Sequence, residues 1–364
     1  MLRSVTVTSA VIHFSASIFL RKVVMAISSS RIVLASRPIG SPTVDNFRLE
    51  SCVTPDPRDG QLLLRTQFLS LDPYMRGRMD AGESYADPVD VGSVMVGGTV
   101  CEVLDSRHPH FKPGDIVLSD SGWQTHDVVD GTDVRRLDPA AAPVSTALGV
   151  LGMPGFTAYA GLHEIGKPKP GETVVVAAAS GPVGSAVGQI AKLRGARAVG
   201  IAGGPEKCSF LLDELGFDAA IDHRAPDFAD RLRAAVPNGI DVYFENVGGE
   251  VASAVLPLLN DFARVPVCGL VAQYNDAYVA DGADRLPGFF SKVLVKRLTV
   301  RGFIVYDFGD DLHDQFQTDV SRWLADGRFT YREEVVDGLE QAPAAFLGLL
   351  QGKNFGKLVV RVSD

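Results

Sequence analysis

The chain has 364 residues, 46% of them hydrophobic, and a formal net charge of −9 at pH 7. This length indicates about two domains, and the composition is typical of a loop-rich α/β enzyme and excludes a fibrous or disordered chain. The negative charge argues against nucleic acid and anionic membranes as partners, because both would repel it. The 4 cysteines are scattered without a C-x-x-C pair, which fits a reducing cytoplasm and indicates neither a disulfide framework nor a zinc cluster.

Residues 1–30 form an N-terminal extension of different character. Residues 1–44 contain no Asp or Glu, and the apolar run from Val5 to Leu20 is interrupted by hydroxyl side chains and by His13. Two alternatives fit this pattern: a targeting segment, or a start of translation at Met25. The run is too short and too polar to span a bilayer, so no membrane partner is expected and a cytoplasmic location is predicted.

The next part of the chain, residues 31–150, has the pattern of a β-domain. Gly, Pro and Asp separate short β-branched and apolar runs, which predict strands at 61–69, 94–103, 115–119 and 123–129. The chain ends in a further β-run at 357–362. We therefore expect a split β-domain made of residues 31–150 and 329–364.

Residues 151–328 alternate between strand and helix patterns at βαβ spacing. Strands are predicted at 173–178, 197–202, 218–221, 240–244, 262–268 and 298–304, with helices between them. This alternation predicts an α/β fold with a doubly wound parallel sheet. The cleft between this domain and the β-domain is the expected active site.

A glycine-rich turn follows the first of these strands. In the run ASGPVG the residues Gly181, Pro182, Val183 and Gly184 separate a strand from a helical pattern, although Ala179 stands where the usual fingerprint has its first glycine. Gly181 allows a pyrophosphate to approach the backbone, Gly184 allows helix and strand to pack, and the helix N-terminus attracts phosphate. The turn predicts a dinucleotide site.

The end of the second strand indicates which dinucleotide binds. A site for NAD needs an acidic side chain there to accept from the ribose 2′-hydroxyl, but this chain has Gly203 and Gly204. Lys207 follows one turn later and can pair with a 2′-phosphate. NADPH is therefore the predicted cofactor.

The histidines and cysteines predict no metal. Zinc needs three or four converging ligands at recognisable spacing, and only His108 and His110 form a close pair, in a loop. The chemistry must therefore come from a hydride donor and from hydrogen bonds.

Five spaced segments carry a resemblance to a known family: LSLDPYMRGRM at 69–79, GMPGFTAY at 152–159, ENVGG at 245–249, VCGL at 267–270 and GKNFGK at 352–357. With the glycine turn, they resemble the medium-chain dehydrogenase/reductases, and among these the zinc-free prostaglandin reductase and leukotriene hydroxydehydrogenase group. The bacterial NADPH-dependent curcumin reductases are the most similar members. The resemblance runs from about residue 31 to the C-terminus and implies a Rossmann nucleotide domain with a GroES-like β-barrel domain.

The resemblance also implies a set of cofactor contacts. They fall on Gly181, Pro182, Val183, Gly184, Lys207, His223, Asn246, Cys268, Gly269, Leu270, Tyr274, Phe303, Ile304, Val305 and Asn354. Animal members have Tyr where this chain has His223, which is followed by Arg224; either side chain can contact the 2′-phosphate, and His223 can make the affinity pH-dependent. The family and the apolar run at 298–305 predict a homodimer.

The implied reaction is reduction of the C=C bond of an α,β-unsaturated ketone or aldehyde. A hydride reaches the β-carbon, and a tyrosine hydroxyl together with a ribose hydroxyl stabilises the enolate oxygen. Tyr274 is the first candidate for this donor and Tyr74 the second. Arg76 is expected to clamp Asp72 or a backbone carbonyl.

Five aromatic residues are candidates for the substrate pocket or the core: Tyr85, Tyr306, Phe289, Phe290 and Phe303. Two alternatives to an enone reductase stay open: a zinc-free NADPH quinone oxidoreductase and a non-catalytic NADPH-binding sensor.

Overall fold

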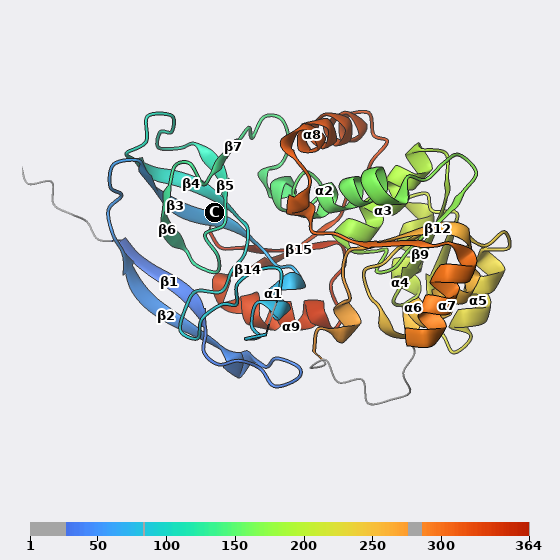
Figure 1. Cartoon of the computed structure of the whole chain (residues 1–364). Helices are drawn as coiled ribbons and strands as arrows, with labels where there is room; N and C mark the ends of the chain where they lie inside the picture. Colours follow the sequence, from blue (N-terminus) through green and yellow to red (C-terminus); the bar gives the residue numbers. More distant parts are fainter. Residues whose placement is uncertain (1–26, 83, 276–285, 364) are drawn as a thin grey trace, which may run out of the picture.

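The computed structural model of the chain describes residues 27–82, 84–275 and 286–363. Figure 1 shows a β-domain in blue and blue-green beside an α/β domain in green to orange. The end of the chain, in red, returns to the β-domain, where β15 (Lys357–Arg361) pairs with β3 (Gln61–Ser70). The predicted fold class, a doubly wound parallel sheet with a second, split β-domain, is confirmed.

The β-domain contains two sheets. β1 (Ile27–Leu34) pairs antiparallel with β2 (Phe47–Thr54), and a larger, 7-stranded sheet has the order β14-β15-β3-β4-β5-β7 with β6 paired to β3. Its remaining strands are β4 (Thr99–Ser106), β5 (Ile116–Ser119), β6 (His126–Asp130), β7 (Arg135–Leu137) and β14 (Glu333–Asp337). The helices of this domain are α1 (Tyr74–Gly77) and α9 (Ala342–Leu350).

Several boundaries in the β-domain differ from the sequence-based expectation. The strand expected at 123–129 begins at His126, where its pairing with β3 begins, because the backbone of Trp123 bonds to Met95 and Ile32 instead. The strand expected at 94–103 begins only at Thr99, because Gly97 and Gly98 interrupt the run and Val94 makes only an isolated bridge to Val33. β1 begins at Ile27, before the expected domain start at residue 31, because its pairing with β2 continues to Ile27 and Thr54. The division into 1–30, 31–150, 151–328 and 329–364 otherwise stays a prediction.

The α/β domain has a 6-stranded parallel sheet in the order β10-β9-β8-β11-β12-β13. Its strands are β8 (Thr173–Val176), β9 (Arg197–Ala202), β10 (Ala219–Asp222), β11 (Ile240–Phe244), β12 (Leu259–Val267) and β13 (Thr299–Gly302). In chain order this is 3-2-1-4-5-6, the order of the dinucleotide-binding Rossmann fold. The six strands expected from the sequence are all present, with ends shifted by up to three residues.

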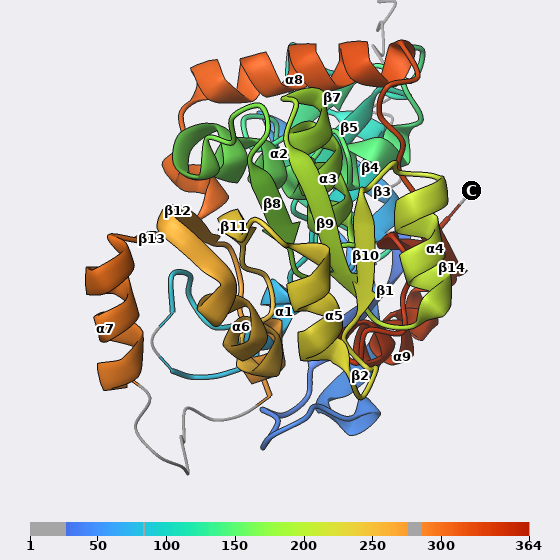
Figure 2. The same ribbon diagram turned by 90° about the vertical axis from the view of Figure 1, so that its right-hand side faces the viewer.

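Helices cover both faces of this sheet (Figure 2). The helices are α2 (Met153–Ala160), α3 (Pro182–Leu193), α4 (Pro205–Asp213), α5 (Phe228–Ala235), α6 (Gly249–Val255), α7 (Leu286–Lys296) and α8 (Asp310–Ala325). Val174 and Val176 of β8 face the apolar cluster under α2, α3, α4 and α8, whereas Val175 faces the cluster under α5 and α6. A central strand buried on both faces explains why its sequence is uniformly apolar. None of the helices in the described ranges is long and apolar enough to cross a membrane.

The strand order places the expected site. β8 and β11 are neighbours in the sheet. After β8 the chain adds β9 and β10 on one side, and from β11 onward it adds β12 and β13 on the other, so the strand order reverses between β8 and β11. In open parallel sheets ligands bind at such a point, outside the carboxyl ends of the strands. The glycine turn follows β8 and Asn246 follows β11, so both lie at this edge.

Candidate active site

The turn between β8 and α3 combines one glycine that packing requires with one that it does not. A Cβ on Gly184 would lie 2.7 Å from Cα of Ala179 and closer still to the carbonyl oxygen of Ala178, so no side chain fits there. A Cβ on Gly181 would meet nothing nearer than that same carbonyl oxygen, at 3.4 Å. Gly181 therefore leaves an open face at the N-terminus of α3, where Pro182 and Val183 form the first turn. This open helix N-terminus suits a phosphate group.

A buried carboxylate shapes the turn after β11. Glu245, 5% exposed, accepts hydrogen bonds from the backbone N–H groups of Val247 at 2.7 Å and Gly248 at 2.9 Å. Burial raises the pKa of Glu245, and these bonds oppose that shift. Asn246 donates from Nδ2 to the carbonyl oxygen of Ala177 at 2.9 Å. The turns after β8 and β11 are thus tied together, and the role of Glu245, an acid directly after an apolar strand, was missed in the sequence.

Basic groups gather where β9 and β10 end. A Cβ on Gly203 would lie 3.0 Å from both Nε2 of His223 and Nε of Arg224, so both side chains converge over this glycine. Burial and the adjacent Arg224 lower the pKa of His223, and Lys207 adds to that effect while Asp222 opposes it. Lys207, His223 and Arg224, hereafter the basic cluster, surround the position where an NAD site has an acid.

The C-terminal segment joins this cluster to the glycine turn. Lys207 donates from Nζ to the carbonyl oxygens of Gly352 at 2.8 Å and of Asn354 at 2.6 Å. Gly356 donates its backbone N–H to the carbonyl oxygen of Ser180 at 3.1 Å. The predicted residues Lys207 and Asn354, far apart in the sequence, therefore meet directly.

The segment after β12 carries Tyr274. A Cβ on Gly269 would lie 3.1 Å from the hydroxyl oxygen of Tyr274 and 3.6 Å from the carbonyl oxygen of Asn246, so this hydroxyl lies at the edge where the strands end. Cys268 and Gly269 donate their backbone N–H groups to the carbonyl oxygen of Glu245. Burial raises the pKa of Cys268 to about 12, which keeps the thiol neutral. Leu270 packs beside this turn, 3.2 Å from the Cβ position of Gly248.

Of the two alternatives for Phe303, the substrate pocket or the core, the structure shows the core. Phe303 and Val305 are each 7% exposed and belong to the core, where the Phe303 ring stands edge-on to Phe244 with centroids 6.1 Å apart. Their side chains are thus directed into the protein, and a ligand could reach only their backbone and Ile304 between them. Phe290 on α7 is 62% exposed and contributes to the outer surface.

Tyr74 reaches the site from the β-domain, on α1. Burial raises the pKa of its hydroxyl above the ordinary value, and the nearby carboxylates of Asp72 and Asp120 raise it further, as do Tyr306 and Tyr85. A hydroxyl with a raised pKa stays protonated at neutral pH and can donate a hydrogen bond. Tyr85 comes from the β-domain and Tyr306 from the α/β domain, so tyrosines of both domains lie near enough to Tyr74 to affect its pKa.

Of the two partners expected for Arg76, Asp72 or a backbone carbonyl, the structure shows a backbone carbonyl. Asp72 pairs with Lys357, whose Nζ lies 2.6 Å from its carboxylate, and both side chains are buried. Arg76 instead donates to the carbonyl oxygen of Gly40 at 2.9 Å and to Oδ1 of Asn275 at 3.1 Å. Because Asn275 follows Tyr274, the segments of both candidate tyrosines touch.

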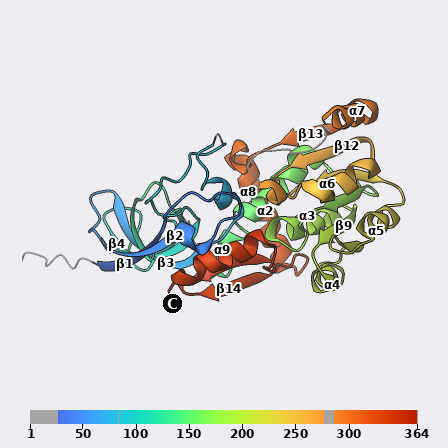
Figure 3. The same cartoon turned by 90° about the horizontal axis from the view of Figure 1, so that it is seen from below.

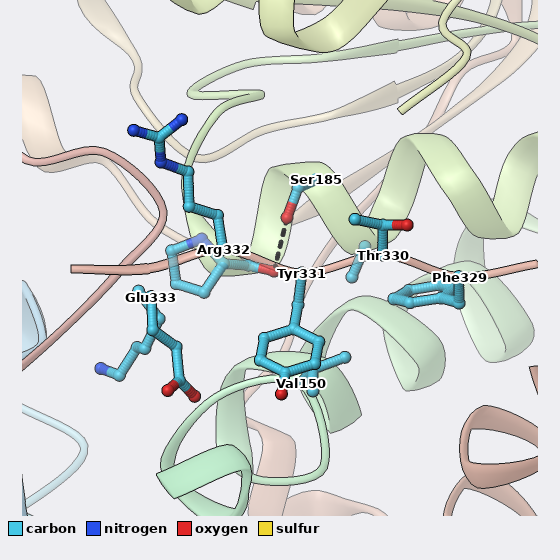
Figure 4. A pocket seen from close by; sticks show the side chains of 10 residues that line it. Val150, Ser185, Phe329, Thr330, Tyr331, Arg332 and Glu333 are labelled. Carbon is cyan, nitrogen blue, oxygen red and sulfur yellow. Dashed lines mark hydrogen bonds between the residues drawn. The ribbon is translucent and has the colours of Figure 1, made fainter. Parts of the chain in front are cut away.

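A small cavity lies beside the first turn of α3 and is lined by Val150, Pro182, Ser185, Ala186, residues 329–333 and Lys357 (Figure 4). Its volume of about 10 Å³ suffices for about one water molecule. Neither Tyr74 nor Tyr274 lines it, and a cavity of this volume is too small for an organic substrate. Among the residues that the structure describes, no group of three or more His, Cys, Asp or Glu side chains is placed to hold a metal ion.

The comparisons with known proteins agree with this architecture. The family model for the N-terminal domain of oxidoreductase matches residues 30–137, and the model named zinc-binding dehydrogenase matches residues 182–326. NADPH-dependent curcumin reductase of Escherichia coli (strain K12) is 57% identical over 92% of this chain and 96% of the relative. Prostaglandin reductase 1 of Bos taurus is 39% identical over 89% of this chain and 96% of the relative.

A solved structure extends the similarity to three dimensions. The crystal structure of CurA in complex with NADPH from Vibrio vulnificus matches with a TM-score of 0.90 and 54% identity, covering 92% of this chain and 99% of that chain. The predicted family is thus confirmed: the chain belongs to the zinc-free medium-chain dehydrogenase/reductases, in the group of the curcumin and prostaglandin reductases.

Proposed function

We propose that this protein is an NADPH-dependent reductase of the C=C bond in α,β-unsaturated ketones and aldehydes. The observation that carries the proposal is the meeting of the Tyr74 and Tyr274 segments, one from each domain, at the edge where a dinucleotide would lie. The names of the similar proteins, an NADPH-dependent curcumin reductase and a prostaglandin reductase, support the same class of reaction.

The residues present fit NADPH. The open face at Gly181 and the N-terminus of α3 would hold the pyrophosphate, since no atom occupies the place a Cβ would take. The basic cluster of Lys207, His223 and Arg224 would pair with the 2′-phosphate, which carries about two negative charges at neutral pH. Asn246, held by Ala177, would orient the nicotinamide end at the junction of β8 and β11.

The chain's own residues then account for the chemistry. NADPH, when bound, supplies the hydride that the β-carbon of the enone receives. Negative charge grows on the carbonyl oxygen, and the Tyr274 hydroxyl donates a hydrogen bond to it, with Tyr74 as the second candidate donor. The α-carbon then receives its proton from a tyrosine hydroxyl or from solvent.

We also propose a homodimer in the cytoplasm. α7 and the edge strand β13 stand at the outer end of the α/β domain (Figure 3). Leu294 is 77% exposed, Val295 63% and Val300 38%. This apolar surface lies beside the outer edge of β13, to which no strand of the described residues pairs, and such a surface suits a second copy of the chain. The cysteines Cys52, Cys101, Cys208 and Cys268 are unpaired, as in a reducing compartment.

The test is NADPH oxidation with a panel of 2-alkenals, alkenones, a diaryl dienone and simple quinones. Enones should be turned over selectively, and Tyr274→Phe should lower kcat at least tenfold, because one donor to a developing oxyanion contributes about 2.7–4 kcal/mol and other donors partly compensate. Tyr331→Phe, whose ring lines the small cavity beside α3, is the matched control and should keep the wild-type rate.

Other outcomes would replace the proposal. Selective turnover of quinones would make the protein a zinc-free quinone oxidoreductase. Binding of NADPH without turnover of any substrate would indicate a non-catalytic NADPH-binding sensor. A Tyr274→Phe variant at the wild-type rate would transfer the donor role to Tyr74, which the Tyr74→Phe variant then tests.

A further inference from the structure

We propose that Arg76 is a positioning residue for the reaction: through Asn275 it holds the loop that carries Tyr274 against the helix that carries Tyr74. This inference rests on the proposed function and adds to it how the hydroxyl of Tyr274 keeps its place. The Arg76–Asn275 hydrogen bond crosses between the β-domain and the α/β domain.

The guanidinium of Arg76 is held on all sides. Arg76 is 3% exposed, and its three nitrogens contact Asp80 of its own segment and two segments that are distant in the sequence. Nε donates to Oδ1 of Asn275 at 3.1 Å, NH2 donates to the carbonyl oxygen of Gly40 at 2.9 Å, and NH1 lies 2.7 Å from Oδ2 of Asp80. NH1 forms an ion pair with Asp80 but no hydrogen bond, so the two hydrogen bonds from Nε and NH2 define the orientation of the planar, rigid guanidinium. The Arg76 side chain is therefore held in one orientation on the same short helix as Tyr74.

The loop of Tyr274 is attached at two ends. At its start, Cys268 and Gly269 donate their N–H groups to the carbonyl oxygen of Glu245. At its end, Asn275 accepts from Arg76, and the backbone oxygen of Asn275 lies 3.9 Å from the Cβ position of Gly40. The Tyr274 hydroxyl lies between these attachments, 3.1 Å from the Cβ position of Gly269.

The burial of the charged Arg76 side chain is unfavourable by itself, so its hydrogen bond to Asn275 needs another explanation than stability. Removing a guanidinium from water is unfavourable, and an apolar side chain would fill the same volume without that cost. An apolar side chain could not hold the Asn275 amide at a defined distance. Catalytic groups must stay within about 0.5 Å of the productive geometry, and a misplacement of about 1 Å can lower a rate by 10²-fold.

The first test measures turnover and binding in Asn275 variants. Asn275→Ala should lower kcat for an enone at least tenfold, while the Kd of NADPH measured by fluorescence stays within twofold of wild type. Asn275→Asp should restore most of kcat, because a carboxylate accepts the same hydrogen bond from Arg76. Asn238→Ala, at an exposed asparagine in the turn before β11, is the matched control.

A double mutant separates positioning from a general structural effect. If Asn275 acts through Tyr274, adding Asn275→Ala to Tyr274→Phe should lower kcat by less than twofold. A full tenfold further loss in the Tyr274→Phe background, or a wild-type kcat in Asn275→Ala alone, would overturn the inference.

Hydrogen exchange tests the Arg76–Asn275 contact, hereafter the clamp, without measuring enzyme activity. Amide exchange in residues 268–275 should rise at least fivefold in Asn275→Ala and in Arg76→Lys, but not in Asn275→Asp. Unchanged exchange in Asn275→Ala overturns the clamp even if enones are substrates. Raised exchange in a protein that reduces no enone would instead refute the proposed function and keep the clamp.

Discussion

At the scale of single residues, His223 should make NADPH binding pH-dependent. Burial and Arg224 lower its pKa in the free protein, whereas a bound dianionic 2′-phosphate would favour the charged imidazolium and raise the pKa. The complex therefore binds more protons than the free protein, so the affinity for NADPH should increase as the pH falls from 8 to 6.5. Each unit of pKa difference corresponds to about tenfold in affinity, and fluorescence titration across this range measures it.

Two controls isolate His223. His223→Gln should bind NADPH with a nearly constant Kd over the same pH range, because glutamine does not titrate. NADH lacks the 2′-phosphate and should show no such dependence with the wild-type protein. A His223→Gln variant that keeps the wild-type pH dependence would assign it to another group.

At the scale of elements, the β8–α3 turn predicts opposite effects for its two glycines. Gly184→Ala places a Cβ 2.7 Å from Cα of Ala179, so α3 must shift and stability should fall by about 1–3 kcal/mol. Gly181→Ala meets no backbone atom within 3.4 Å, so stability should hold while the Cβ fills the space for the pyrophosphate. Thermal unfolding and NADPH titration of both variants measure this contrast.

The two glycine variants serve as controls for each other. Gly181→Ala should keep the wild-type Tm and bind NADPH at least tenfold more weakly, whereas Gly184→Ala should lose several degrees of Tm. If Gly181→Ala binds NADPH with the wild-type Kd, the pyrophosphate does not lie on the open face of this turn.

At the scale of the whole molecule, the exposed apolar face of α7 predicts a dimer interface, and one charged substitution in that face should prevent dimerisation. Leu294 is 77% exposed in one chain, so Leu294→Asp should change the stability of that chain by no more than about 0.5 kcal/mol. A carboxylate in an apolar interface would lose its hydration, so the variant should be monomeric where the wild type is dimeric. Light scattering after size-exclusion chromatography measures the mass.

A second exposed leucine provides the comparison. Leu212 on α4 is 43% exposed on a different face, and Leu212→Asp should leave the dimer intact. A dimeric Leu294→Asp variant would move the interface away from α7, and a monomeric wild type would refute the homodimer.

Local patterns carried much of the prediction. The runs of β-branched residues around Val174 and the glycines after them predict strand, turn and helix, because these depend on neighbours in the sequence. The ends of strands were less certain, as at Thr99, where two glycines shorten the strand. The role of Lys207 in binding a 2′-phosphate could be predicted locally, because no acidic residue stands at the end of the second strand and Lys207 follows within one turn.

Contacts between distant residues could not be predicted from local patterns. Lys357 pairs with Asp72 across 285 positions, and Arg76 reaches Asn275 across 199. Such pairs depend on which strands become neighbours and on how the two domains meet. The sequence left Asp72 and a backbone carbonyl as alternative partners of Arg76, and only the fold decides between them, because Lys357 on β15 lies beside Asp72 and Arg76 binds the carbonyl oxygen of Gly40.

The sequence by itself determined the α/β fold class, the glycine turn and the family, because backbone conformation and burial follow from periodicity and spacing within short segments. Only the tertiary structure decided that the segments of Tyr74 and Tyr274 meet, that Lys207 binds the carbonyl oxygens of Gly352 and Asn354, and that Phe303 faces the core. The physical reason is that a site between domains is built from the ends of many strands. Its geometry exists only after the sheet order and the domain packing bring those ends together.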